Sequence, residues 1–393
     1  MQGISLASRD PYAENAWRKA WDMTRQIPKF LAVLIAIGLA SGVAFAQSGA
    51  PDGRVAPRGD RLFGVDVTTP QDGDFDAAFV RALEVGSQVV EIPMLWTDIE
   101  VAPGVYDPEP NWLAIANQYY PQHEIRIVLN VNPIDTTVLH LPADLVGRSM
   151  DDPLVISRYA NVLDWVFEQI PDLTLDCVAI GNEVDVYLGE DPAAYEAYRT
   201  FFRAARKRVR SHRAGTPVGV KSTYVGLMET APKPLRRLNL EADTVLVTYY
   251  PLDSSFRVRA PGVVHQDMKV LVGKYPSTKR PIRLLECGYP SGDPSRGPGG
   301  SAPTGSTPEL QAAFIREMFR AWDTHRRRIA LVKFTWMHDS SPASVATLQQ
   351  YYGVSHPAFR DYLATLGLRT YAGAGEDKPA FTALAEEASR RGW

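Results

Sequence analysis

Short apolar segments rich in β-branched residues alternate with longer amphipathic segments along most of this chain. Eight of the apolar segments have the length and composition of β-strands. Their ranges are 62–68, 88–95, 125–131, 175–182, 217–223, 243–250, 281–287 and 329–336. Strands that alternate with helices form parallel sheets, and strands that are apolar almost throughout are typical of sheets buried on both faces. Eight such strands predict a closed (β/α)8 barrel, a TIM barrel, in a single domain over residues 61–393.

Four segments between the predicted strands show the helical pattern most clearly. They cover residues 74–86, 152–170, 191–212 and 307–328. Apolar residues recur in them at spacings of three and four, so each helix can cover the barrel with one face. In the last of them, Thr307 is expected as the N-cap and Pro308 as the first helical residue. The alternative is an open doubly wound sheet, but the segment GVDVTTPQDGD after the first strand contains no phosphate-binding GxGxxG motif.

Composition limits the partners that this chain is expected to have. The length of 393 residues suits one barrel domain, and 45% hydrophobic with 22% charged residues is ordinary for a globular protein with a large core. The formal net charge is −3 without a long basic segment, which argues against nucleic acid and favours a neutral ligand. The seven histidines form neither an HExxH motif nor a Cys/His cluster, so neither a metal nor a cofactor is expected. Cys177 and Cys287 fall near opposite ends of the predicted barrel and are expected to be free, buried thiols.

Residues 30–46 form an apolar segment with basic residues before it and small residues at its end. Arg25 and Lys29 precede it, and Ala-Phe-Ala closes it. Basic, apolar and small residues in this order are the three regions of a secretory signal peptide, so cleavage is expected after Ala46. The alternative is an uncleaved membrane anchor, because about 17 apolar residues is the lower limit for spanning a bilayer.

The predicted organisation is therefore a signal peptide at 1–46, a linker at 47–60 and the barrel. A start at Met23 instead of Met1 would give a signal peptide of ordinary length. The linker is rich in Gly, Pro and Ser, which is typical of a segment without a fold of its own. We expect an exported protein, periplasmic or secreted.

Polar residues interrupt the predicted strands at their carboxyl ends, the face where barrel active sites lie. The candidate site residues at this face are Asp66, Trp96, Asn130, Asn182, Glu183, Tyr250, Glu286 and Trp336. Glu183 ends the fourth strand and Glu286 the seventh, and a narrow barrel would bring both side chains to one site. Most glycosidases cleave with two carboxyl groups, one protonated and one ionised. The sequence therefore indicates cleavage of a glycosidic bond.

Four features, in this order along the strands, resemble the clan A glycoside hydrolases. They are IGNE at 180–183, YYP at 249–251, Glu286 closing the seventh strand and Trp336 closing the eighth. The resemblance implies a retaining enzyme with Glu286 as nucleophile and Glu183 as general acid/base. Asn182 would bond the sugar 2-hydroxyl, and Trp336 would form the floor of the sugar site. The segments 95–107 and 367–381 are similar to clan members too, so the resemblance covers nearly all of the predicted barrel.

The clan pattern also places a tyrosine of the sixth strand against the nucleophile. Tyr250 is expected in this role rather than Tyr249, because neighbouring strand residues face opposite ways. Trp96, Asn130 and Asp66 are the remaining candidates for sugar contacts.

Glu91 departs from the clan pattern, because many members carry at its position an arginine that touches the nucleophile. Three interpretations are open: another cation takes the place of the arginine, the alignment is shifted by a residue, or the site is modified. The last interpretation motivates a second hypothesis, a carbohydrate-binding barrel without catalysis. A barrel with unrelated chemistry, such as a lyase, is a third.

The sugar stays open at this stage. Residues 286–292, ECGYPSG, resemble plant-type β-1,3-glucanases, whereas TYYP at 248–251 is nearer the β-1,4-galactanases. The leading hypothesis is a retaining hydrolase or transglycosylase acting on a β-linked oligo- or polysaccharide. The pKa of Glu183 is expected to be raised by burial and by Glu286. Residues 291–310, rich in Gly, Pro and Ser, are expected to form an irregular, mobile lip that tolerates deletion.

Overall fold

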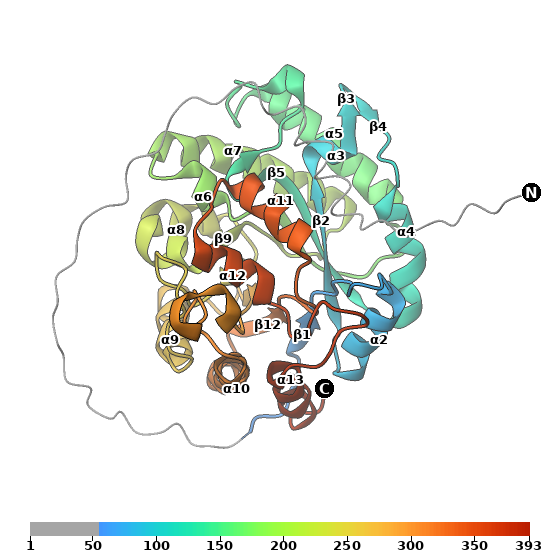
Figure 1. The fold of residues 1–393 in the computed structure, drawn as a ribbon. Coiled ribbons are helices and arrows are strands. Elements are labelled where there is room, and N and C mark those ends of the chain that lie inside the picture. The colour runs from blue at the N-terminus through green and yellow to red at the C-terminus, as the bar shows by residue number, and fades with distance from the viewer. Residues whose placement is uncertain (1–54) are drawn as a thin grey trace, which may run out of the picture.

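The computed structural model describes residues 55–393, which form one domain around a parallel sheet (Figure 1). The predicted signal peptide and linker residues 47–54 lie outside the described residues. Residues 55–60 form neither helix nor strand and pack against the end of the chain, where the Arg58 amide donates to the Arg391 carbonyl over 2.8 Å. None of the described helices has the length and apolar character needed to cross a membrane.

The sheet is a barrel of eight parallel strands, as the sequence predicts. The strands are β1 (Leu62–Val65), β2 (Val89–Leu95), β5 (Arg126–Asp135), β7 (Leu175–Asn182), β8 (Val218–Gly219) with β9 (Lys221–Thr223), β10 (Val245–Tyr249), β11 (Ile282–Cys287) and β12 (Ile329–Phe334). Their order is β8-β7-β5-β2-β1-β12-β11-β10-β9. Because β8 and β9 are separated only by Val220, the two ends of this order adjoin and the barrel is nearly closed.

Helices cover the outside of the barrel with their apolar faces (Figure 1). They are α2 (Phe75–Glu84), α4 (Trp112–Tyr119), α5 (Pro153–Gln169), α7 (Pro192–His212), α8 (Pro232–Leu240), α9 (Val263–Lys274), α10 (Pro308–Thr324) and α13 (Pro379–Ser389). The predicted start of α10 is confirmed, since Thr307 is the N-cap, its hydroxyl accepts from the Leu310 amide over 3.3 Å, and Pro308 is the first helical residue.

Shorter elements follow the carboxyl ends of several strands. They are α3 (Trp96–Ile99), β3 (Glu100–Ala102), β4 (Val105–Tyr106), β6 (Val138–Leu139), α6 (Val184–Leu188), the turn η4 (Gly226–Thr230), α11 (Pro342–Tyr352) and α12 (Pro357–Thr365). Single helical turns occur at η2 (Tyr120–His123), η3 (Ala143–Leu145), η5 (Pro294–Arg296) and η6 (Pro298–Gly300). In Figure 1, α11 and α12 are drawn in front of the barrel strands.

The barrel interior changes from apolar to charged along the strands, because alternate residues of each strand face inward. An apolar layer includes Val89, Val128, Ala179, Leu246 and Leu331, together with the free thiol of Cys177. Two residues further along the same strands come Glu91, Asn130, Thr248 and Lys333. Gly64 has no side chain at the height of this layer, and a Cβ there would lie 3.1 Å from Lys333 Cγ. The charged layer lies beneath the carboxyl ends of the strands, where the candidate site is expected.

Candidate active site

Glu183 directly follows β7 at the mouth of the barrel and occupies the N-cap position of α6. Its φ of 44° is in the left-handed region, as is the φ of 50° at Thr136, which follows β5. The Thr136 hydroxyl donates to Glu183 Oε2 over 3.0 Å, and the Thr248 hydroxyl donates to Oε1 over 2.6 Å. Non-glycine residues in this backbone conformation are strained, and such residues cluster at functional sites. Burial, followed by the charge of Glu286, raises the pKa of Glu183 to about 7, so this carboxyl can hold a proton near neutrality.

Glu286 ends β11, where the register against β10 shifts. Val247 pairs with Leu284 but Thr248 pairs with Glu286, so Leu285 is an extra residue in the strand. Such a bulge re-aims the side chain that follows it. Leu285 packs in the apolar layer inside the barrel, and the Glu286 carboxyl also reaches interior groups.

Both oxygens of Glu286 receive a donor. The Tyr250 hydroxyl donates to Oε2 over 2.7 Å, and Lys221 Nζ lies 2.5 Å from Oε1. The predicted contact of Tyr250 is thus present, whereas Tyr249 faces the other way and donates to Asp267 over 2.8 Å. Glu286 is therefore held by a cation and a phenol, while Glu183 accepts from two neutral hydroxyls.

A chain of charges, Asp66–Lys333–Glu91–Lys221–Glu286, crosses the barrel interior. Lys221 Nζ is 2.8 Å from Glu91 Oε1, and Lys333 Nζ is 3.1 Å from Glu91 Oε2 and also contacts Asp66. Burial acts to raise the pKa of Glu91, but Lys221 and Lys333 outweigh it and hold that pKa at about 2. Burial acts to lower the pKa of Lys221, but Glu286 and Glu91 raise it above the ordinary value.

This chain of charges explains why Glu91 occupies a position where the clan pattern has an arginine. Of the three interpretations, the structure supports the first, because Lys221 supplies a cation at the candidate nucleophile. The role of Lys221 was missed from the sequence, although a lysine inside the apolar strand segments PVGVKST and IALVKFTW was the available signal. A buried lysine needs an anionic partner, and only barrel closure shows which one.

Asp66 and Asn130 lie at different depths below the mouth. Asp66 is half-buried beside Lys333, accepts from the Thr335 hydroxyl over 3.3 Å, and has a pKa that burial raises to about 6 despite Lys333. Asn130 is buried and donates to Glu91 over 3.0 Å. The structure thus places Asn130 beneath the carboxyl pair as a support for Glu91.

Asn182 is half-buried beside Glu183. Its Nδ2 donates to Asp135 Oδ1 over 2.7 Å, and its buried Oδ1 bonds to no atom of the described residues. Asn182 as a whole is only half-buried, and its contact with a sugar 2-hydroxyl stays a prediction.

The two candidate tryptophans differ. Trp336 is half-buried at the end of β12, after a cis peptide bond, and packs in one cluster with Tyr352 and Tyr362. Trp96 is 0% exposed, and its indole donates to Glu100 over 2.7 Å while its ring packs on Tyr159. A side chain without exposed surface cannot touch a ligand, so the expected sugar contact of Trp96 is corrected to a role in the core.

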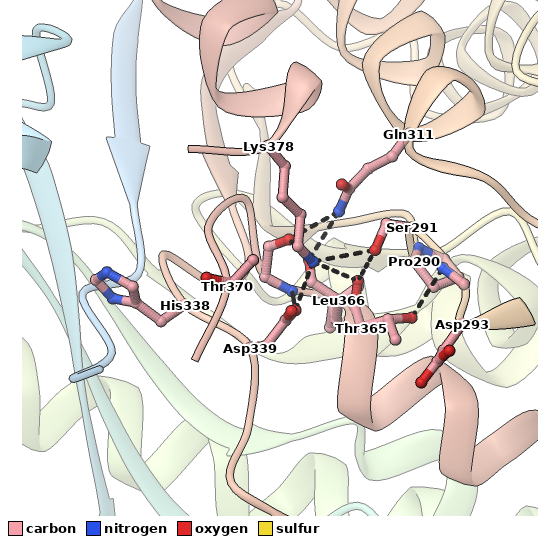
Figure 2. Close-up of polar contacts among 12 residues, drawn as sticks. Pro290, Ser291, Asp293, Gln311, His338, Asp339, Thr365, Leu366, Thr370 and Lys378 are labelled. Atoms are coloured by element: carbon pink, nitrogen blue, oxygen red, sulfur yellow. Dashed lines mark hydrogen bonds and ion pairs between the residues drawn. The ribbon is translucent and has the colours of Figure 1, made fainter. Parts of the chain in front are cut away.

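The loop expected at 291–310 is anchored at both ends. The Ser291 amide donates to the Thr365 carbonyl over 2.9 Å, and the buried carboxylate of Asp361 accepts from the Asp293 amide and the Thr304 hydroxyl over 3.0 and 2.7 Å. Figure 2 shows Lys378 reaching into the same region, with Nζ 2.6 Å from Asp339 Oδ1 and 3.0 Å from Ser291 Oγ.

The expectation of an irregular lip is therefore limited to the middle of this loop. Ser295, Arg296 and Ser301 are exposed, whereas Thr304 and Ser306 are buried. Within residues 55–393, no group of three or more His, Cys, Asp or Glu side chains is arranged to hold a metal ion.

Neither a scan against protein-family models nor a search of curated proteins finds a match. Solved structures of glycoside hydrolases match over most of the chain. A GH5_18 from Bifidobacterium longum subsp. infantis has 14% identity and a TM-score of 0.61, over 84% of this chain and 79% of that one. A GH5_18 from Streptomyces cattleya in complex with GlcNAc has 18% identity and a TM-score of 0.62, over 86% and 80%.

A beta-glucosidase from Exiguobacterium marinum has 11% identity and a TM-score of 0.58, over 85% of this chain and 99% of that one. At these identities the likeness shows the shared fold, a single (β/α)8 barrel of the kind that these glycoside hydrolases have.

Proposed function

We propose that this protein is a retaining glycosidase that cleaves a β-linked glycan, with Glu286 as nucleophile and Glu183 as general acid/base. The observation that carries the proposal is the unequal surroundings of two carboxyls at one barrel mouth. Glu183 accepts from neutral hydroxyls and has a pKa of about 7, whereas Glu286 is paired with Lys221 and Tyr250. One group suited to hold a proton and one paired with a cation are what double displacement needs.

In the first step, Glu286 attacks the anomeric carbon while Glu183 gives its proton to the leaving oxygen. The glycosidic C–O bond breaks, the leaving group departs as an alcohol, and an ester forms between the sugar and Glu286. The Tyr250 hydroxyl and Lys221 fix the attacking carboxylate, and Asn182 is placed to bond the sugar 2-hydroxyl.

In the second step, Glu183 takes a proton from water, which attacks the anomeric carbon and releases Glu286. The ester has removed the charge of Glu286, which was one cause of the raised pKa of Glu183. That pKa therefore falls, and the same group becomes a base. A sugar hydroxyl in place of water gives transglycosylation.

The substrate that this site supports is a neutral oligo- or polysaccharide. Asp66 and Asn182 offer polar atoms for hydroxyls, and the half-buried ring of Trp336 offers an apolar surface for a sugar face. The Streptomyces cattleya GH5_18 is in complex with GlcNAc, which gives a precedent for a saccharide ligand in a protein of this fold. We extend the proposal to a substrate outside the cytoplasm, on the strength of the signal-peptide pattern at residues 30–46.

The test is a screen of β-glucans, galactans and mannans, with product stereochemistry followed by NMR. Glu286→Gln should abolish turnover, and Glu183→Gln should abolish it on substrates whose leaving group needs a proton. Glu168→Gln, on the exposed face of α5, is the matched control and should keep activity. Full activity of either active-site variant would refute the assignment, and inverted product would refute retention.

The alternative of a binding barrel without catalysis rested on Glu91. Lys221 supplies the cation whose absence motivated that reading, so the glycosidase is the proposal that the geometry supports better.

A further inference from the structure

The segment between β12 and α13 carries two helices, α11 and α12, that lie at the mouth of the barrel. In Figure 1 these helices are drawn in front of the strands, between the elements that follow β5 and those that follow β10. The βα-loops of a barrel together build the face where active sites lie. The segment between β12 and α13 contacts elements on two sides of the mouth.

On one side, Tyr351 at the end of α11 reaches the carboxyl end of β5. Its hydroxyl donates to Asp135 Oδ2 over 2.7 Å, and Asn182 donates to Asp135 Oδ1 over 2.7 Å. His140 Nε2 lies 2.9 Å from the same tyrosine oxygen. The insert is thus joined through Asp135 to the residue next to Glu183.

On the other side, α12 is fastened to the segments that follow β10 and β11. The rings of Phe359 and Phe256 pack at 4.7 Å, and those of Tyr362 and Tyr250 at 5.4 Å. Asp361, which is fully buried, accepts from the Thr304 hydroxyl over 2.7 Å. The insert therefore has anchors to β5 and to the β10–β11 side at once.

The underside of the insert faces the carboxyl pair. Tyr352 and Tyr362 pack with Trp336 in the cluster that holds α11 and α12 together. Burial raises the pKa of Tyr352, and the nearby charges of Asp135, Glu183 and Glu286 raise it further. The Tyr362 ring packs on Tyr250, whose hydroxyl donates to Glu286, so α12 lies beside the proposed nucleophile.

The mouth has a different character beside α6, one turn after Glu183. Val186 and Tyr187 are 43% and 42% exposed, and Val225, which follows β9, is 41% exposed. Asp185 holds the two segments together, since it accepts from the Thr223 amide and hydroxyl over 2.9 and 2.6 Å. Exposed apolar side chains thus adjoin the proposed acid/base, on the side where a leaving group would depart.

We propose that the enzyme acts at non-reducing chain ends, with the terminal sugar enclosed beneath α11 and α12 and the leaving group passing Tyr187. This inference rests on the proposed glycosidase function. A polymer cleaved internally must continue past the cleaved sugar in both directions. Here the bridge from Tyr351 to Asp135 joins α11 to the barrel beside Asn182, whereas Val186 and Tyr187, just after Glu183, are exposed. We take the bridged side as the closed end of the site and the exposed side as its open end.

The test compares short β-linked gluco-, manno- and galacto-oligosaccharides with the same compounds capped by a 4,6-O-benzylidene group on the non-reducing sugar. The wild type should release the terminal sugar first, leave the viscosity of the parent polymers unchanged and fail on the capped compounds. Falling viscosity with early internal products, or equal rates on capped compounds, would overturn this inference and leave the glycosidase proposal standing. No hydrolysis of any substrate would overturn both.

Tyr351→Phe tests the bridge itself, since it removes one hydroxyl that donates to an aspartate. Tyr119→Phe is the matched control, because the Tyr119 hydroxyl donates to Asp76 over 2.8 Å on the outer surface. Without this hydrogen bond the contact between α11 and Asp135 is weakened, so Tyr351→Phe should gain turnover of capped compounds that the wild type does not cleave. The control should not change. Equal product patterns in the two variants would show that the bridge does not set the cleavage mode.

Discussion

Replacing Lys221 by methionine tests whether this lysine holds the candidate nucleophile. Lys221 Nζ lies 2.5 Å from Glu286 Oε1 and 2.8 Å from Glu91 Oε1, and its side chain is 2% exposed. Methionine keeps an unbranched, flexible stem and removes the charge. The interior chain of charges then keeps three carboxylates but only one ammonium, that of Lys333.

The size of the effect follows from burial. Removing one partner of a buried ion pair costs about 3–5 kcal/mol. Because Lys333 still contacts Glu91 and Tyr250 still donates to Glu286, we expect the free energy of unfolding to fall by about 3 kcal/mol. The folded pKa of Lys221 is raised above its ordinary value of 10.5, so its stabilising contribution is complete below pH 10.5 and is lost only as the pH rises through the folded value. A measurement at pH 7 therefore captures all of it.

We expect the activity of Lys221→Met to fall as well, because it depends on the position of the Glu286 carboxylate and not only on stability. Loss of the cation leaves the carboxylate misplaced, and misplacement of this kind costs about a hundredfold in kcat/KM.

Urea unfolding followed by circular dichroism and the value of kcat/KM measure the two effects. Lys221→Arg keeps the charge, and Lys269→Met removes an exposed lysine of α9 as the matched control. An unfolding free energy within about 0.5 kcal/mol of wild type, together with an unchanged kcat/KM, would refute the assigned role of Lys221.

Four further predictions concern Glu183, the loop after β11 and the anchor of that loop, Asp361. The folded pKa of Glu183 is about 7 against an ordinary 4.5, so its ionised form disfavours folding at high pH. Glu183→Gln should therefore raise the free energy of unfolding by about 3 kcal/mol at pH 8 and leave it unchanged at pH 4. Urea titrations at the two pH values measure this difference. The alkaline limb of kcat/KM should lie near pH 7 and should flatten in Glu183→Gln on substrates with good leaving groups; an unmoved limb would remove Glu183 from the acid/base role. Deleting residues 298–300 should leave the melting temperature unchanged. Gly297 and Ser301 already lie close together, since a Cβ on Gly297 would overlap the Ser301 carbonyl oxygen, so the shortened loop can join them directly. Asp361→Asn should lower the free energy of unfolding by about 2 kcal/mol, because the Thr304 hydroxyl and the Asp293 amide lose the carboxylate that accepts from them. Equal stability of Asp361→Asn and of the variant without residues 298–300 would contradict the anchoring of the loop at its ends.

The sequence by itself determined the architecture. Each of the eight predicted segments overlaps a barrel strand, because parallel strands buried on both faces must be apolar and this leaves a local pattern. The boundaries were less accurate. The first strand ends at Val65 instead of residue 68, β5 continues to Asp135 where it pairs with β6, and the fifth strand is interrupted at Val220.

The contact between Tyr250 and Glu286 could also be predicted, since both residues close strands and face alternation selects between two adjacent tyrosines. The prediction that Trp96 contacts a sugar is wrong, and strand alternation gave no warning of this. Trp96 belongs to the short helix α3 and not to a strand, so strand alternation does not say where its ring points.

Only the tertiary structure decided what surrounds the carboxyl pair. Lys221 and Glu91 are 130 residues apart, and closure of the barrel brings their strands to face one another across its interior. The extra residue Leu285 follows from the register between two strands, which neither strand's own sequence specifies. Tyr351 meets Asp135 across 216 residues because α11 crosses the mouth instead of staying beside β12. Periodicity is a local property of the chain, whereas these contacts depend on how distant strands are aligned and where an insert packs, so they appear only when the whole barrel is assembled.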